Sequence, residues 1–379
     1  MTGKVILSIL LLGMVMGVAL PIAVPGMGEG DFLAYWSASR LLAQGENPYD
    51  PDALATLQQA VRPQRYQEQG AVLPAWNPPW LLILFLPISL LPFSIATGVW
   101  IACNVILGGT SAALAWGQVV RPFDARGYLF VLFAGLVFPS FLVTVAIGQV
   151  TVLVLIGMLS SIVLIQSRRE WLAGAALLLC GIKPHLCFLF LAILGFWIIR
   201  NRRWKVAGGL AVSLLSSLIL VTIFYPAWVS AYRGLLSHMP VADIDTSTLG
   251  SFMQQRFGLP YFRWAGTLLL VLLVPFTRLV FKNHWLTALN LSTLLTLPFA
   301  PYGFGADQVL LLPAMVEITG WLKLKAKQPW QTVLVLSAPI LVNLGWLFWM
   351  PKNVPNHTLF WIPLAALAVY ALVWRLTHR

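Results

Sequence analysis

The chain has 379 residues, of which 59% are hydrophobic and only 9% are charged. Soluble domains carry about 25% charged residues, so this composition excludes a soluble protein and predicts a polytopic membrane protein. The net charge of +12 does not indicate a nucleic-acid partner, because the basic residues stand in short loops between apolar runs, as the positive-inside rule predicts.

The first apolar run covers residues 5–24. It is longer than the roughly 7–15 apolar residues of a signal peptide, so we expect a retained first span. Pro87 and Pro92 predict that residues 80–92 form an interfacial or re-entrant piece instead of a full crossing. The apolar runs predict spans near 4–24, 94–118, 127–147, 150–167, 171–183, 186–200, 205–225, 261–281, 285–299, 306–322, 330–350 and 357–376.

The charged residues orient these spans. If Lys4 is cytoplasmic and the chain crosses at each run, most of the 24 basic residues fall on the cytoplasmic side and most of the 12 acidic residues on the other. If the alternation of cytoplasmic and external loops is shifted by one crossing, the basic and acidic residues no longer separate. We therefore expect one all-α transmembrane domain over residues 1–379, with about twelve helices and both termini cytoplasmic. Large external segments follow at 25–79 and 226–260.

The first external segment has its own helical pattern. We predict a helix from Phe32 to Gln44 that ends at Gly45, and a turn over residues 47–50. Residues 52–69 alternate apolar and polar side chains at helical spacing, which predicts a helix on the membrane surface.

Asp31 stands where the chain leaves its first apolar run. Ionisable groups at the edge of a bilayer are rare and tend to be functional or paired. On a helix, Asp31 and Tyr35 share one side, and Arg40 lies on an adjacent stripe. A carboxylate at this place can act as a general base toward a sugar hydroxyl. The alternative is structural, because Asp31 can be the N-cap of the helix.

Three further turns predicted on the external side carry polar residues beside Gly or Pro. The first is Gly148-Gln149, which can also be a tight turn with a solvated Gln. The second is Lys183-Pro184-His185, where the lysine is suited to a phosphate but can also be snorkelling at a helix end. The third, residues 301–308, holds Tyr302 and Asp307, and Asp307 is a strong candidate for a helix cap. Because all of these turns open to one side, the sequence predicts a shared site.

Nucleotide and metal motifs are absent from the sequence. We find no Walker, HExxH, GxSxG or dinucleotide motif, and the three cysteines form no CxxC pair, so we expect no cofactor and no metal. Asp243 and Asp245 have DxD spacing, which keeps a metal possible, but no α/β domain surrounds them.

This ordered set of motifs resembles glycosyltransferase family 87, whose members are polyprenol-phosphate-mannose-dependent α-mannosyltransferases of the GT-C superfamily. The resemblance implies an integral membrane enzyme, such as one of a bacterial plasma membrane. It implies inverting transfer of a sugar from a polyprenyl-phosphate donor to a glycan or glycolipid hydroxyl on the non-cytoplasmic face. The motifs are Gly30-Asp31-Phe32, Tyr35, Ala38, Arg40, Gly45, Asn47-Pro48-Tyr49-Asp50, Asn77-Pro78-Pro79, Gly148-Gln149, Gly174 and Lys183-Pro184.

The resemblance also assigns roles. Asp31 would deprotonate the acceptor, and Lys183 would neutralise the leaving phosphate, with both side chains in one cavity. Arg40 and His185 are further candidates for the phosphate. The candidates for the sugar or the acceptor are Tyr35, Asn77, Gln149, Tyr302 and Asp307.

Other functions stay open at this point. A transporter or flippase of lipid-linked sugars would suit the many apolar helices and the lysine among them. Such a protein should place ionisable residues near mid-membrane, whereas here the polar turns gather on one side. A family member with another sugar or acceptor, and a non-catalytic assembly subunit, are the remaining alternatives.

Overall fold

The computed structural model describes residues 3–28, 30–62, 72–239, 244–325 and 355–378. Every regular element in these ranges is a helix, which confirms the prediction of a helical membrane protein. Five segments are long and apolar enough to cross a membrane. They are α1 (Gly3–Ala23), α6 (Phe93–Val119), α12 (Trp204–Phe224), η3 (Pro260–Leu272) continued by α15 (Leu273–Phe281), and η6 (Asn356–Phe360) continued by α19 (Trp361–His378).

The span predicted over 127–147 is broken into two helices. α7 (Ala125–Leu136) and α8 (Pro139–Ile147) meet at an angle of 61°. Pro139 opens α8, and Phe138 before it is extended, as the residue preceding a proline prefers. The bend carries the end of α8 into the interior, where its last turn contributes to the site described below.

Several apolar helices are too short for a straight crossing, which needs about 20 residues. They are α5 (Trp80–Ser89), α9 (Thr151–Gln166), α10 (Glu170–Cys180), α11 (Phe188–Arg200) and α16 (Trp285–Phe299). By length and composition the described residues hold five spans, or six with the bent pair. The count of twelve stays a prediction, and the span predicted at 330–350 lies outside the described residues.

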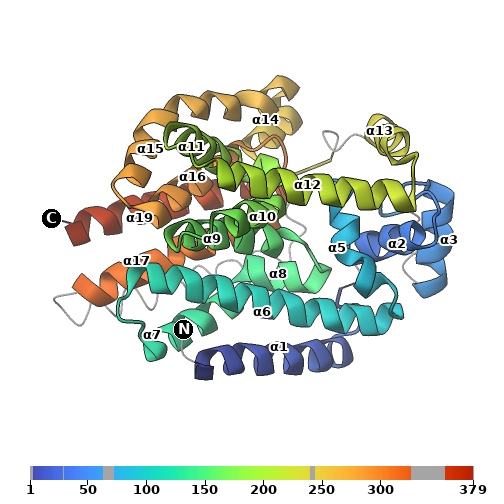
Figure 1. Cartoon of the computed structure of the whole chain (residues 1–379), viewed down its shortest axis with the longest axis horizontal. Helices are drawn as coiled ribbons and strands as arrows, with labels where there is room; N and C mark the ends of the chain where they lie inside the picture. The colour runs from blue at the N-terminus through green and yellow to red at the C-terminus, as the bar shows by residue number, and fades with distance from the viewer. Residues whose placement is uncertain (1–2, 29, 63–71, 240–243, 326–354, 379) are drawn as a thin grey trace.

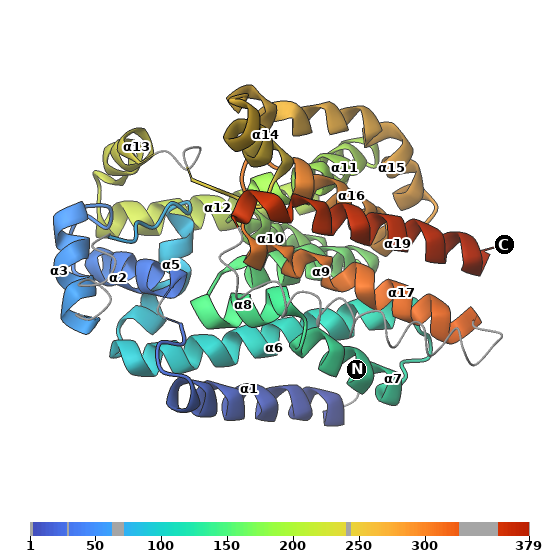
Figure 2. The ribbon, with the colours of Figure 1, turned by 180° about the vertical axis from the view of Figure 1, so that it is seen from behind.

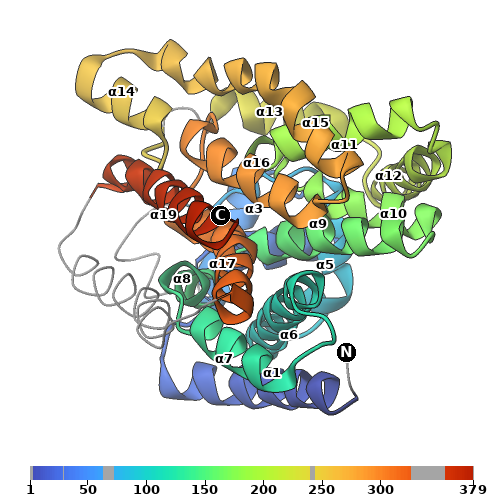
Figure 3. The same cartoon turned by 90° about the vertical axis from the view of Figure 1, so that its left-hand side faces the viewer.

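The core is built around α9. This helix is apolar on all sides, and it packs against α6 and α10, as Figure 3 shows. A helix without a polar face must be buried in protein or lipid. At the edge of the bundle, α1 lies along α6 through glycine contacts. A Cβ added at Gly17 would lie 2.6 Å from the carbonyl oxygen of Gly98, so the two backbones approach closely.

The first external segment folds close to the prediction. α2 (Asp31–Ala43) is buried against α5, and Gly45 follows its end with a left-handed φ of +75°. α3 (Pro51–Val61) is capped by the Asp50 side chain, which accepts hydrogen bonds from two backbone N–H groups. The predicted continuation of this helix to residue 69 lies outside the described residues.

The second external segment contains α13 (Trp228–His238) and α14 (Leu249–Phe257). α2, α3, α5 and α13 gather at one end of the molecule, and both chain ends lie toward the other end (Figures 1 and 2). The last part of the core is η4 (Gly305–Leu311), continued by α17 (Leu312–Lys325).

Candidate active site

Asp31 is the first residue of α2, and Gly30 occupies the N-cap position. The alternative of Asp31 as the N-cap residue is therefore wrong. A Cβ added at Gly30 would lie 2.7 Å from the Ile147 side chain, so the start of α2 runs directly against the end of α8. This close approach sets Asp31 beside the turn that joins α8 to α9.

Gly148 shapes that turn. It has a left-handed backbone with φ of +68°, which glycine adopts without a steric cost. A Cβ there would also lie 2.4 Å from Cβ of Phe32 on α2. The turn therefore requires glycine for its conformation and again for its contact with α2.

Gln149 connects the turn to α2. Its Oε1 accepts hydrogen bonds from the Tyr35 hydroxyl at 2.8 Å and from the Val150 backbone N–H at 2.8 Å. Because both of these partners are donors, the amide nitrogen must face the other way, where it donates to Oδ2 of Asp31. Gln149 is only 1% exposed, so the Asp31 carboxylate is held by a buried side chain on a rigid turn.

A second buried cluster centres on Asp307. Nζ of Lys183 lies 2.7 Å from Oδ1 of Asp307, and both side chains are almost fully buried. The Thr151 hydroxyl donates to the same oxygen, and the Phe304 backbone N–H donates to Oδ2 at 2.8 Å. Asp307 thus caps η4, as the alternative for this residue predicted, and it also pairs with Lys183.

The charge state of this cluster follows from its contacts. Lys183, the Thr151 hydroxyl and the Phe304 backbone N–H all donate to the Asp307 carboxylate, and such donors favour its ionised form. Asp307 is therefore ionised. The sequence predicts that Lys183 faces a phosphate and that Asp307 faces a sugar or an acceptor, and it does not indicate that these two side chains pair.

His185 and Tyr302 extend this cluster. Lys183 precedes η1 (Pro184–Leu186), and the ring of His185 lies 3.8 Å from the ring of Tyr302, between centroids. Burial and then the neighbouring Lys183 lower the pKa of His185 to about 3. The imidazole is neutral at physiological pH, so it can offer a hydrogen bond but no positive charge.

The two clusters belong to one region. Gln149 and Thr151 are two residues apart, which places their Cα atoms within about 7 Å. The pKa of the Tyr35 phenol is raised, mainly by burial and then by the negative charges of Asp31 and Asp307. Both carboxylates therefore lie close enough to influence the same hydroxyl. The sequence does not mark Thr151 as a site residue, because it opens an apolar run, although it lies two residues after Gln149.

The remaining candidates lie in different places. Nδ2 of Asn77 donates weakly to the carbonyl of Ile182 at 3.4 Å, directly before Lys183. Arg40 donates to the carbonyls of Ser89 and Leu90, each at 3.0 Å, and so holds the end of α5. Nine residues along α2 separate it from Asp31, a rise of about 14 Å. Arg40 therefore has a structural role at the end of α5, away from the Asp31 carboxylate.

The described residues contain no group of three or more His, Cys, Asp or Glu side chains that could hold a metal. Asp243 of the DxD sequence lies outside the described residues. Oδ1 of Asp245 accepts from the backbone N–H of His357 at 3.0 Å and lies 2.8 Å from Nδ1 of that residue. Asp245 therefore ties the second external segment to the start of the last helical segment.

Helix ends thus bring buried polar and charged groups together inside an apolar bundle. This arrangement defines the protein as a helical membrane protein with a polar interior site. A model of glycosyltransferase family 87 matches residues 76–301, more than half of the chain. The protein belongs to glycosyltransferase family 87 and is a membrane glycosyltransferase. Neither the curated proteins nor the solved structures contain a match to the chain.

Proposed function

We propose that this protein transfers a sugar, expected to be mannose, from a polyprenyl-phosphate donor to a hydroxyl of a glycan or glycolipid on the non-cytoplasmic face. The observation that carries the proposal is the continuity between Asp31 and Lys183. Asp31 is held by Gln149, and Thr151 two residues later reaches Asp307, which pairs with Lys183. A base and a leaving-group cation must flank one reacting centre, and this chain of contacts supports the assignment of Asp31 and Lys183 to one site.

Asp31 would act as the general base. As the acceptor oxygen attacks C1 of the sugar, its proton passes to the Asp31 carboxylate, and the C1–O bond to the phosphate breaks. A single displacement of this kind inverts the anomeric carbon. Gln149 positions the carboxylate through its amide N–H, and Tyr35 positions Gln149 in turn.

Lys183 would stabilise the polyprenyl phosphate, which takes the electron pair of the broken bond and gains negative charge. An ammonium has three N–H bonds, and Asp307 accepts one of them. Asp307 fixes the position of the ammonium, and Lys183 can still donate to a phosphate oxygen as charge develops there. His185 lies two residues after Lys183. Its neutral imidazole can add a hydrogen bond to the phosphate oxygens that Lys183 contacts.

The proposal is tested with purified full-length protein in detergent and radiolabelled polyprenyl-phosphate mannose. We expect Asp31→Asn to lower the rate of sugar transfer by about 10²- to 10⁴-fold, the usual contribution of a general base. Asp52→Asn is the matched control, since Asp52 is an exposed carboxylate at the start of α3. Unchanged transfer by Asp31→Asn would overturn the assignment of the base.

The same preparation separates the other functions. Movement of intact lipid-linked sugar across a vesicle membrane, without a glycosylated product, would favour a flippase. Activity that needs a partner subunit and survives Asp31→Ala would favour an assembly subunit. Donors that carry other sugars, offered in parallel, identify the sugar.

A further inference from the structure

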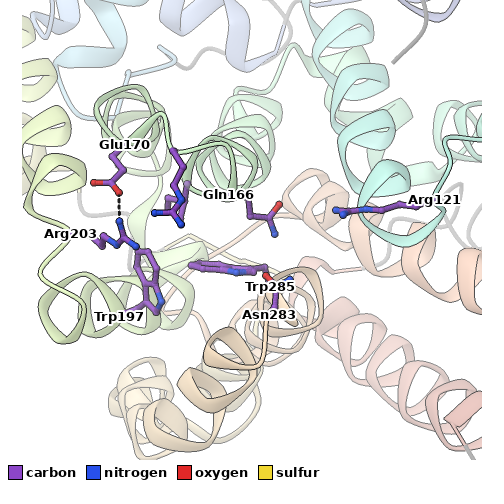
Figure 4. Close-up of a pocket in the computed structure, with 9 residues that line it drawn as sticks. Arg121, Gln166, Glu170, Trp197, Arg203, Asn283 and Trp285 are labelled. Atoms are coloured by element: carbon purple, nitrogen blue, oxygen red, sulfur yellow. Dashed lines mark hydrogen bonds and ion pairs between the residues drawn. The ribbon is translucent and has the colours of Figure 1, made fainter.

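A second polar region lies at the other end of α9 from the candidate active site. Thr151 opens this helix and Gln166 closes it, a rise of about 22 Å. Beside Gln166 is a pocket of about 320 Å³, formed where four interhelical connections meet (Figure 4). The connections join α6 to α7, α9 to α10, α11 to α12, and α15 to α16.

Positive charge dominates the lining of this pocket. Arg121, Arg168 and Arg203 contribute to it, and Glu170 is the one carboxylate among its lining residues. Arg203 pairs with Glu170 at 2.7 Å and also lies 6.0 Å from the centre of the Trp197 ring. Three guanidinium groups against one carboxylate leave two positive charges. In the part of the chain that the structure describes, no carboxylate pairs with Arg121 or Arg168.

Two of the lining residues have an unusual backbone conformation. Arg168 and Asn283 both line the pocket, and both have a left-handed backbone, with φ of 60° and 65°. Each directly follows the last turn of a helix, where glycine is the favoured residue. Asparagine adopts this conformation readily, but an arginine there costs free energy that glycine would avoid, so Arg168 is present at the expense of stability.

Aromatic residues form the apolar side of the pocket. Trp197 and Trp285 are 8% and 6% exposed, and their rings meet edge to face with centroids 5.0 Å apart. Ile199, two residues after Trp197 on α11, and Phe281, at the end of α15, are 63% and 49% exposed. Tryptophan is typical of the membrane–water interface, and exposed aliphatic and aromatic side chains beside it suit contact with acyl chains.

We propose that this pocket binds the phosphate of an anionic membrane lipid, held by Arg121 and Arg168 beside the two tryptophans. Basic pockets between transmembrane helices are typical sites for anionic headgroups. A free phosphate compound shares the headgroup chemistry, but the tryptophans and the exposed apolar side chains favour a lipid. This site is separate from the candidate active site and does not depend on the reaction proposed above.

The test is native mass spectrometry of the full chain in detergent, titrated with phosphatidylglycerol or with phosphatidylcholine. The key variant is Arg168→Gly, which removes the charge and relieves the backbone, so it should fold at least as well as the parent. The matched control is Arg202→Gly, since Arg202 has the same left-handed backbone (φ of 53°) but does not line the pocket. We expect Arg168→Gly to weaken phosphatidylglycerol binding about fivefold, as loss of one basic contact implies, and Arg202→Gly to leave it unchanged.

Equal binding of phosphatidylglycerol by Arg168→Gly and the parent would overturn the proposal. So would an equal loss in both glycine variants, because that would show general attraction to the basic surface. Inorganic phosphate forms the second arm. If the pocket retains phosphate that depends on Arg168 while phosphatidylglycerol and phosphatidylcholine bind alike, the ligand is a soluble phosphate compound and the lipid assignment is wrong.

Discussion

At the scale of single residues, the ion pair of Lys183 and Asp307 is the costliest feature of the site. Each charge loses several kcal/mol of solvation on burial, and their attraction repays this only with good geometry and further hydrogen bonds. Asp307 has those bonds, from Thr151 and from the Phe304 backbone. A well-packed apolar pair would hold the same turns together at lower cost, so the charges suit a role in binding an anion.

We predict from this that Lys183→Met and Asp307→Asn each lower the free energy of unfolding by about 3–5 kcal/mol, because each leaves one buried charge without its partner. The double variant Lys183→Met/Asp307→Asn should be more stable than the sum of the single losses, yet should transfer no sugar. Thermal unfolding in detergent and the transfer assay measure these two properties. Additive losses of stability would contradict the coupling of the two residues.

At the scale of the elements, most residues of the candidate site stand at or next to a helix end or in a loop between helices. α2 supplies Asp31 and Tyr35 from its first two turns, the α8–α9 turn supplies Gln149, and the residues before η1 and in η4 supply Lys183 and Asp307. A helix satisfies its own backbone groups internally, so inside an apolar bundle the polar chemistry gathers where helices stop. The bend between α7 and α8 is what brings one of these ends inward.

Gly148 and Gly258 offer a matched test of the α8–α9 turn. Both have φ of +68°, so alanine costs about 1–2 kcal/mol of backbone strain at either position. A Cβ at Gly258 meets nothing within 4 Å, whereas at Gly148 it would lie 2.4 Å from Phe32. We expect Gly148→Ala to lower stability by about 1–3 kcal/mol more than Gly258→Ala, and to reduce transfer, because overpacking pushes α2 away from Gln149. Equal effects of the two variants on thermal unfolding and transfer would show that the contact with Phe32 is unimportant.

At the scale of the whole molecule, polar regions lie at both ends of α9. One holds the carboxylates of Asp31 and Asp307 and the ammonium of Lys183, and the other is strongly basic. The rise of about 22 Å between them is comparable to the roughly 30 Å of a bilayer core. In the predicted orientation, the candidate active site faces the external leaflet, and the arginine pocket faces the cytoplasm. The basic end then meets the leaflet that the positive-inside rule requires.

This orientation predicts opposite labelling of two introduced cysteines by a membrane-impermeant thiol reagent. Asp52→Cys in α3 should react from the external side of intact cells, and Arg202→Cys only after the cells are opened. Both positions are exposed, and the native cysteines are buried or half-buried, so they should contribute little background. Labelling of both variants in intact cells, or of Arg202→Cys alone, would overturn the predicted topology.

Composition and hydropathy were enough to predict a helical membrane protein, and the boundaries of α1, α2, α6, α9 and α12 lie within a few residues of their predicted ranges. These features depend on local sequence, because an apolar run in lipid must satisfy its backbone as a helix. The Gly-Gln, Lys-Pro and aspartate motifs predicted the turns where the structure brings buried polar groups into contact, since ionisable groups beside a bilayer are costly and few.

What the sequence could not supply is which polar groups meet. The ion pair of Lys183 with Asp307 and the hydrogen bond from Gln149 to Asp31 both join residues more than a hundred positions apart. Arg40 shows the converse, since its place near Asp31 in the sequence did not keep it near Asp31 in space. Helix spacing determines which residues share a face, but only the packing of helices decides which faces meet, because a side chain's partner is set by distance in three dimensions.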